Sequence, residues 1–302
     1  MFLEDISGLK QSYSAMLLTE GGNAFSNVGA IHISEIEPTI NGLAQVLQIP
    51  DLGSHVLGSV GKKEYSGDVD IALKPKNPEE LGKFIERLKK VLGQENVRQV
   101  GGLITTAVKI QGYNPKKDKR QPRTGYVQVD FIFGNPEWLK LYFHSPSSKD
   151  SKLKGTHRNL AIASIAAHVD RQSSDEIDSY GRPVKIIRWK WSPKDGLVKV
   201  ERTSRKKATG GWVKKQDDKV ISEPVTDAKG IADVLFQGKA DAKVLDSAES
   251  LIAAVKKYYT ADAAESVFRT MARNFDTKPD LAGGDFEYPP EVAKYMGTGN
   301  GR

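Results

Sequence analysis

Helical and strand-like hydrophobic patterns alternate along the first half of the chain. Apolar residues recur at helical spacing in residues 37–50, where Pro38 suits a first helical turn. Residues 77–93 carry stronger signals, with Asn77 as a cap, Pro78 at the first helical position, early glutamates and late lysines. Runs of alternating or continuous apolar residues predict strands at 54–59, 68–73, 102–110 and 125–134. This order predicts an α/β layer rather than a repeat array or a helical bundle.

The pattern changes after residue 135. Small and apolar residues predict a helix at 156–170, and two strands at 184–203 are predicted to pair across the turn Pro193–Gly196. Two late helices are predicted to start at Asp246 and Thr260 as caps, followed by an irregular tail after about residue 276. We therefore predict an α/β (α+β) fold with two domains. Residues 1–150 form a small mixed sheet with flanking helices, and 151–302 form a mixed helical and strand accessory or substrate-binding domain.

Composition narrows the classes of function. The 302 residues include 45 Lys and Arg against 38 Asp and Glu, and the resulting net charge of +7 favours anionic partners. The chain has no cysteine, so disulfides and thiolate metal sites are excluded, and any metal must bind oxygen or one of the 5 histidines. The amino terminus lacks the pattern of a signal peptide, and no apolar run has the length of a membrane span. We expect a soluble, cytoplasmic protein without a membrane partner.

Two carboxylates one residue apart interrupt the apolar strand at 68–73. If Val69 and Ile71 face a core, then Asp68 and Asp70 point together to the opposite face of the strand. Two carboxylates placed side by side repel one another unless a cation lies between them. An exposed strand face is the ordinary alternative for such a pair.

The residues around this pair resemble a known signature. The stretch Leu57-Gly58-Ser59, a spacer of eight residues, and then Asp68-Val69-Asp70 on a strand is similar to the motif of the polymerase-β-like nucleotidyltransferase superfamily. Members of that family use a third carboxylate on a later strand, and Asp130 in the strand 125–134 has the matching position. The resemblance covers about residues 40–135 and identifies no subfamily.

The resemblance implies a site for two Mg²⁺ ions, with Mn²⁺ as an alternative metal. Asp68 and Asp70 would bridge both ions, and Asp130 would bind the ion nearest the attacking hydroxyl. Such transfer depends on positioning and on neutralising phosphate charge, and Mg²⁺ prefers hard oxygen ligands. Gly58 would let the backbone approach a nucleoside triphosphate such as ATP, and Ser59 with neighbouring amides at a helix start would hold its phosphates.

Four cations are further candidates for contact with the triphosphate. Lys62 and Lys63 lie in the spacer of the motif, and Lys154 and Arg158 lie at the start of the helix predicted at 156–170. A solvated loop is an equally good interpretation of the two spacer lysines.

Two basic runs suggest nucleic-acid contact. Residues 114–123 carry five basic residues, and residues 199–215 interleave Trp212 with seven. Solvated loops are the alternative interpretation of both runs.

We therefore predict a Mg²⁺-dependent nucleotidyltransferase. It would move a nucleoside monophosphate from a nucleoside triphosphate to a hydroxyl of an RNA or DNA end, such as a tRNA 3′ end, with release of pyrophosphate. Transfer to a protein or a small molecule is one alternative. A non-catalytic nucleic-acid-binding or assembly protein that retains the fold is the other.

Overall fold

The computed structural model describes residues 24–100, 103–115, 123–147, 151–276 and 287–297. The chain divides into two compact units, Met1–Ser148 and Lys149–Arg302, beside the boundary expected near residue 150. Both units combine helices with small sheets, so the fold is mixed α/β. Within the described ranges, every helix is too short or too polar to cross a membrane.

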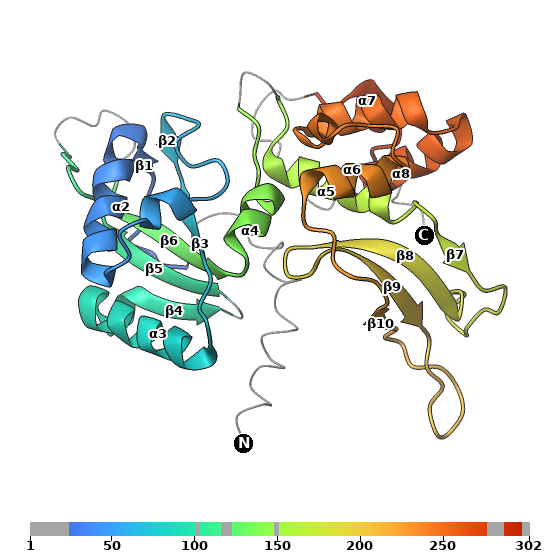
Figure 1. Ribbon diagram of the computed structural model, residues 1–302, viewed down its shortest axis with the longest axis horizontal. Coiled ribbons are helices and arrows are strands. Elements are labelled where there is room, and N and C mark those ends of the chain that lie inside the picture. Colours follow the sequence, from blue (N-terminus) through green and yellow to red (C-terminus); the bar gives the residue numbers. More distant parts are fainter. Residues whose placement is uncertain (1–23, 101–102, 116–122, 148–150, 277–286, 298–302) are drawn as a thin grey trace. The chain divides into compact units, whose positions relative to one another are not determined.

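The first unit is built on a four-stranded sheet in the order β3-β6-β5-β4 (Figure 1). The edge strand β3 runs parallel to its neighbour β6, whereas the other neighbours are antiparallel. A two-stranded pair, β1-β2, precedes the sheet in the chain. The strands are β1 (Ile31–His32), β2 (Tyr65–Ser66), β3 (Asp68–Leu73), β4 (Val97–Val100), β5 (Leu103–Lys109) and β6 (Tyr126–Phe133).

Helices α2 and α3 bury one face of this sheet, and short helical turns connect them to it. The helical segments are α2 (Ile33–Leu47), η1 (Leu52–His55), α3 (Pro78–Leu92), η2 (Gln94–Asn96) and α4 (Pro136–Tyr142). Apolar side chains of α2 and α3 form one core with Val69 and Ile71 of β3 and Val129 of β6. Helix α3 begins as the sequence predicts, because the Asn77 side chain accepts a hydrogen bond from the Glu80 N–H at 2.8 Å.

Two predictions for this unit were wrong. Helix α2 begins at Ile33, which places Pro38 inside the helix rather than in its first turn. A capping box starts the helix instead, in which the His32 side chain accepts from the backbone and Glu35 accepts from the His32 N–H. The segment 54–59 is not a strand either. It leaves the turn η1 and pairs with β3 only through a bridge from Val56 to Ile71.

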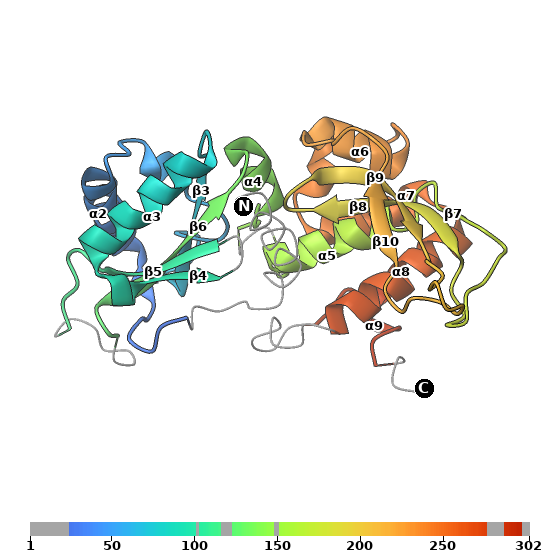
Figure 2. The same cartoon turned by 90° about the horizontal axis from the view of Figure 1, so that it is seen from below.

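The second unit contains an antiparallel sheet in the order β10-β9-β8-β7 together with several helices (Figure 2). The predicted hairpin is confirmed as β8 and β9, which pair along their whole length. The strands are β7 (Gln172–Ser173), β8 (Lys185–Ser192), β9 (Gly196–Thr203) and β10 (Asp217–Val220). The helical segments are α5 (Gly155–Ala166), α6 (Ala228–Phe236), η3 (Ala242–Leu245), α7 (Ala248–Tyr258), α8 (Ala261–Asp276) and α9 (Pro290–Ala293).

The late helices of the second unit lie close to their predicted positions. Helix α7 is capped by Ser247, whose hydroxyl accepts from the Ser250 N–H at 3.0 Å, one residue after the predicted cap Asp246. Thr260 directly precedes α8 as predicted. Of the tail expected to be irregular after residue 276, residues 277–286 and 298–302 lie outside the described residues, and α9 occupies part of the rest.

Candidate active site

Three carboxylates share one face of the first unit's sheet. Asp70 of β3 pairs directly with Asp130 of β6, and Asp68 pairs with Gln128. Since side chains of paired residues point to the same side of a sheet, and every second residue of a strand does too, Asp68, Asp70 and Asp130 all project from the face opposite the α2–α3 core. The alternation predicted for residues 68–73 is therefore confirmed, and it extends to the strand that carries Asp130.

The glycine turn of the motif lies against this face. The Leu57 N–H donates to the Asp70 carbonyl at 2.8 Å. This hydrogen bond holds the segment before Gly58 beside strand β3. Gly58 follows with a φ of +71°, a left-handed conformation that favours glycine. A Cβ added at Gly58 would lie 3.6 Å from Oδ2 of Asp70. The structure thus brings together the two halves of the motif across the eight-residue spacer.

Burial makes two of these carboxylates, Asp68 and Asp130, weaker acids than usual. Burial, aided by the negative charge of Asp68 and opposed by hydrogen bonds from Gln128 and Thr105, raises the pKa of Asp130 to about 6. Burial also raises the pKa of Asp68. The Gln128 amide Nε2 donates to both oxygens of Asp130, at 3.2 and 3.0 Å, and so orients that carboxylate. Such a group is stabilised by any cation that binds beside it.

Gln128 and Thr105 are site residues that sequence reasoning missed. Gln128 lies two residues before Asp130 on the same strand, so strand alternation alone places both on one face. Thr105 enters through the pairing of β5 with β6, where it lies opposite Asp130. Only the register of the sheet reveals Thr105, whereas Gln128 had a signal in the sequence.

The donor set suits a hard divalent cation. The face offers carboxylate oxygens, which Mg²⁺ prefers, and Mg²⁺ takes its remaining ligands from water and substrate phosphates. Among the described residues, no three His, Asp or Glu side chains lie close enough together, as they stand, to hold a metal ion. Asp68, Asp70 and Asp130 would hold such an ion on this half-buried face of the sheet.

The remaining residues of the motif lie in a turn. Ser59 is exposed, and its carbonyl accepts from the Lys62 N–H at 3.1 Å, so residues 58–61 form a turn and not the helix start that we expected. The Lys62 amine donates to the Ser145 carbonyl, and its burial there lowers the pKa of Lys62. Lys63 is exposed. Lys62 is therefore held in place, whereas Lys63 extends into solvent.

Lys154 and Arg158 belong to the second unit. Lys154 is exposed and precedes α5, where its N–H donates to Nδ1 of His157 at 3.3 Å. Arg158 is completely buried, with its guanidinium donating to the Leu245 carbonyl and to Asn159. These contacts make Arg158 part of the packing of the second unit.

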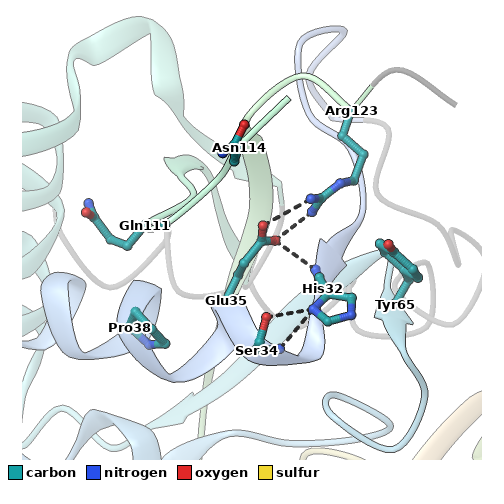
Figure 3. Close-up of a pocket in the computed structure, with 9 residues that line it drawn as sticks. His32, Ser34, Glu35, Pro38, Tyr65, Gln111, Asn114 and Arg123 are labelled. Carbon is teal, nitrogen blue, oxygen red and sulfur yellow. Dashed lines mark hydrogen bonds and ion pairs between the residues drawn. The ribbon is translucent and has the colours of Figure 1, made fainter. Parts of the chain in front are cut away.

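A separate cavity of about 380 Å³ lies at the amino-terminal end of α2 (Figure 3). Arg123 crosses it and binds Glu35 through two hydrogen bonds, at 2.6 and 3.0 Å, with both side chains about nine-tenths buried. His32 and Tyr65 complete its wall, with their rings 5.0 Å apart. The charges of this cavity are thus neutralised within the protein. Arg123 ends the basic run 114–123, of which residues 116–122 lie outside the described residues.

No protein-family model matches this chain, and no curated protein matches it in sequence. The case for the site therefore depends on its geometry and electrostatics.

Proposed function

We propose that the first unit is a nucleotidyltransferase of the polymerase-β-like type, with Mg²⁺ or Mn²⁺ as its metal. The observation that carries this proposal is the register that pairs Asp70 with Asp130 on the face shared by Asp68, with the Gly58 turn against Asp70. That arrangement agrees with the motif to which the sequence is similar. The substrate would be a nucleoside triphosphate attacked at its α-phosphate by an acceptor hydroxyl, and pyrophosphate would leave.

The chain's own residues suit this reaction in four ways. The carboxylates concentrate negative charge where a divalent cation would offset the charge of the phosphates. The left-handed turn at Gly58 has no side chain, which leaves its backbone open to a phosphate group. Lys62, fixed by the Ser145 carbonyl, supplies a positive charge within the same turn. Gln128 holds Asp130 in one orientation throughout.

The acceptor is proposed to be the hydroxyl of a nucleic-acid end. The chain's net charge of +7 favours a polyanionic acceptor, and every nucleic acid is a polyanion. The three acceptor classes differ in where the transferred nucleotide is found, so one experiment separates them.

The test incubates purified protein with Mg²⁺, each α-³²P-labelled nucleoside triphosphate, cellular RNA and cellular protein, and then separates RNA, protein and small molecules. We expect label in RNA with the wild-type chain and none with Asp68→Ala/Asp70→Ala. The variant Asp175→Ala, which removes an exposed carboxylate of the second unit, should retain the wild-type rate. Label in the protein or small-molecule fraction would show that the acceptor belongs to that class and is not a nucleic acid. If no fraction carried label and the protein did not bind triphosphate, the proposed nucleotidyltransferase activity would be refuted.

A further inference from the structure

The positive charge of the chain is concentrated in one sheet. The span from Lys185 to Val220, which contains β8, β9 and β10, holds 12 of the 45 basic residues and 4 of the 38 acidic residues. It therefore carries a net charge of +8, while the rest of the chain carries −1 to give the total of +7. The chain is basic because of this sheet alone.

Within the strands, acidic and basic side chains pair with one another. Lys185 binds Glu201 at 2.6 Å, and Arg202 binds Asp218 at 2.6 Å. Lys190 also approaches Asp218, at 3.2 Å. Five of the eight excess charges lie on the connection between β9 and β10, and the strands themselves keep the other three.

That connection is a hairpin, residues 205–215, which we name the basic finger. Figure 1 shows it extending beyond the ends of the strands. Backbone hydrogen bonds run across it, from the Val213 N–H to the Arg205 carbonyl at 2.7 Å and from the Lys207 N–H to the Gly211 carbonyl at 2.8 Å. The Lys206 amine lies 4.9 Å from the centre of the Trp212 ring. The finger is therefore a short hairpin, closed by one bridge between Lys206 and Trp212.

The basic finger exposes its cations and contains no acid. Its five basic side chains are all exposed: Arg205, Lys206, Lys207, Lys214 and Lys215. Arg205 pairs with Asp217 at the root of the finger. No described residue forms a hydrogen bond or ion pair with the ammonium groups of Lys207, Lys214 and Lys215. These three positive charges are therefore available to bind an external anion.

The buried carboxylate of Asp178 organises a hydrogen-bond network at the base of the basic finger. Oδ2 of Asp178 accepts from Nη2 of Arg182 and from the Ser204 hydroxyl, both at 2.7 Å. Arg182 then donates from Nη1 to the Lys214 carbonyl at 2.6 Å, and the Gln216 amide donates to the Ser204 hydroxyl at 2.8 Å. These hydrogen bonds lower the pKa of Asp178, which stays ionised. Both strands of the finger are thus tied to one point, which reduces the ordering cost of binding.

We propose that the basic finger binds the phosphate backbone of a nucleic acid. Unpaired lysines on a braced hairpin suit phosphates spaced along a strand, and contact with phosphates displaces condensed counterions without reading the sequence. A hairpin also has the width that a duplex groove accepts. This binding does not depend on any transfer reaction at the carboxylates of the first unit.

The test measures binding of the full-length chain to fluorescent duplex and single-stranded oligonucleotides by anisotropy, between about 50 and about 200 mM salt. Nucleotide and metal are omitted, and Asp70→Ala is used throughout, so that the result is independent of the proposed enzymatic activity. The test variant is Lys207→Ala/Lys214→Ala/Lys215→Ala. The matched control removes three exposed lysines elsewhere in the second unit, Lys239→Ala/Lys243→Ala/Lys257→Ala.

We expect the test variant to lose affinity on the order of 10- to 100-fold and its slope of log K against log salt to fall by roughly 2 to 3, while the control binds as before. Asp178→Asn keeps every lysine, and we expect it to bind more weakly and to exchange the finger's amide hydrogens faster. Equal binding by the two triple variants would overturn the proposal. So would a parent chain that binds vesicles of anionic lipid but no nucleic acid.

Discussion

The two four-stranded sheets of this protein carry charges of opposite sign in opposite environments, buried in one and exposed in the other. The first unit places carboxylates on a half-buried face, where burial raises the pKa of Asp68 and Asp130. The second unit places lysines on an exposed hairpin and keeps its most deeply buried carboxylate, Asp178, ionised by an arginine. A buried acid of raised pKa favours a small cation that reaches it, whereas exposed lysines favour a large anion. The difference separates a candidate reaction centre from a candidate docking surface.

The largest expected effect separates the two regions by function. Asp70→Asn should lower nucleotide transfer by on the order of 10²–10³-fold or more, because it removes a proposed metal ligand and leaves the fold unchanged. The same variant should bind nucleic acid through the basic finger as the wild type does. Parallel measurement of transfer rate and anisotropy checks both statements. A variant that lost both properties together would show that the two regions do not act separately.

The two units should respond to acid with opposite signs. Burial lowers the pKa of His157 to about 4 from its ordinary 6.5, so the unfolded chain binds more protons between these values, and the second unit loses stability as the pH falls through that window. Asp130 titrates near 6 instead of 3.8, so the metal-free first unit gains stability as the pH falls from about 6 to about 4. Each effect is on the order of 3 kcal/mol.

Hydrogen exchange resolved by peptide, with a chelator present, follows each unit separately at pH 4.5 and pH 7. His157→Phe should remove the acid sensitivity of the second unit, and Asp130→Asn should remove the opposite trend in the first. The same sign in both units would contradict the assigned burial of one of these side chains.

A smaller effect tests the support of Asp130. Gln128→Leu removes the amide that orients this carboxylate, and loss of such a partner of a metal ligand weakens metal affinity by about 10- to 100-fold. We expect the Mg²⁺ concentration for half-maximal transfer to rise, with little change in rate at saturating Mg²⁺. Thr106→Ser, which alters a neighbouring strand on the core face, serves as the control. An unchanged Mg²⁺ requirement in Gln128→Leu would exclude Asp130 as a ligand.

The smallest effect compares two left-handed glycines. Gly58 and Gly210 have φ angles of +71° and +80°, so alanine at either position should cost about 1–2 kcal/mol of stability. Gly58 lies against Asp70, whereas an added Cβ at Gly210 meets nothing within 4 Å. Chemical denaturation should show similar losses for both variants, and only Gly58→Ala should also slow transfer. If Gly58→Ala and Gly210→Ala transferred nucleotide at equal rates, the turn at Gly58 would not be part of the site.

The sequence predicted those parts of the fold whose signals are local. Helix α3 carries its cap and its charge gradient within its own residues, and β3 and β6 carry their alternation within theirs. The beginning of α2 was wrong because Pro38 suggested a first turn, while the capping box formed by His32 and Glu35 starts the helix earlier. The strand expected at 54–59 reduces to one bridge, since its residues enter a helical turn first.

The candidate site divides in the same manner. Alternation within β3 predicted that Asp68 and Asp70 share a face, which the register confirms. The placement of Asp130 beside Asp70 depends on pairing between distant strands, and it followed only from the resemblance. The burial of Arg158 depends on packing against η3, to which no pattern in its own helix pointed.

The parallel pairing of β3 with β6 also bears on the order of folding. Along the chain, α3, β4 and β5 separate these two strands, whereas β8 and β9 are joined by the short turn at residues 193–195. Local hairpins form within microseconds, and pairings between distant segments form later because closing the longer loop costs more entropy. We expect the basic sheet to assemble early and the three carboxylates to meet last, so that their mutual repulsion arises only once the core that opposes it is complete.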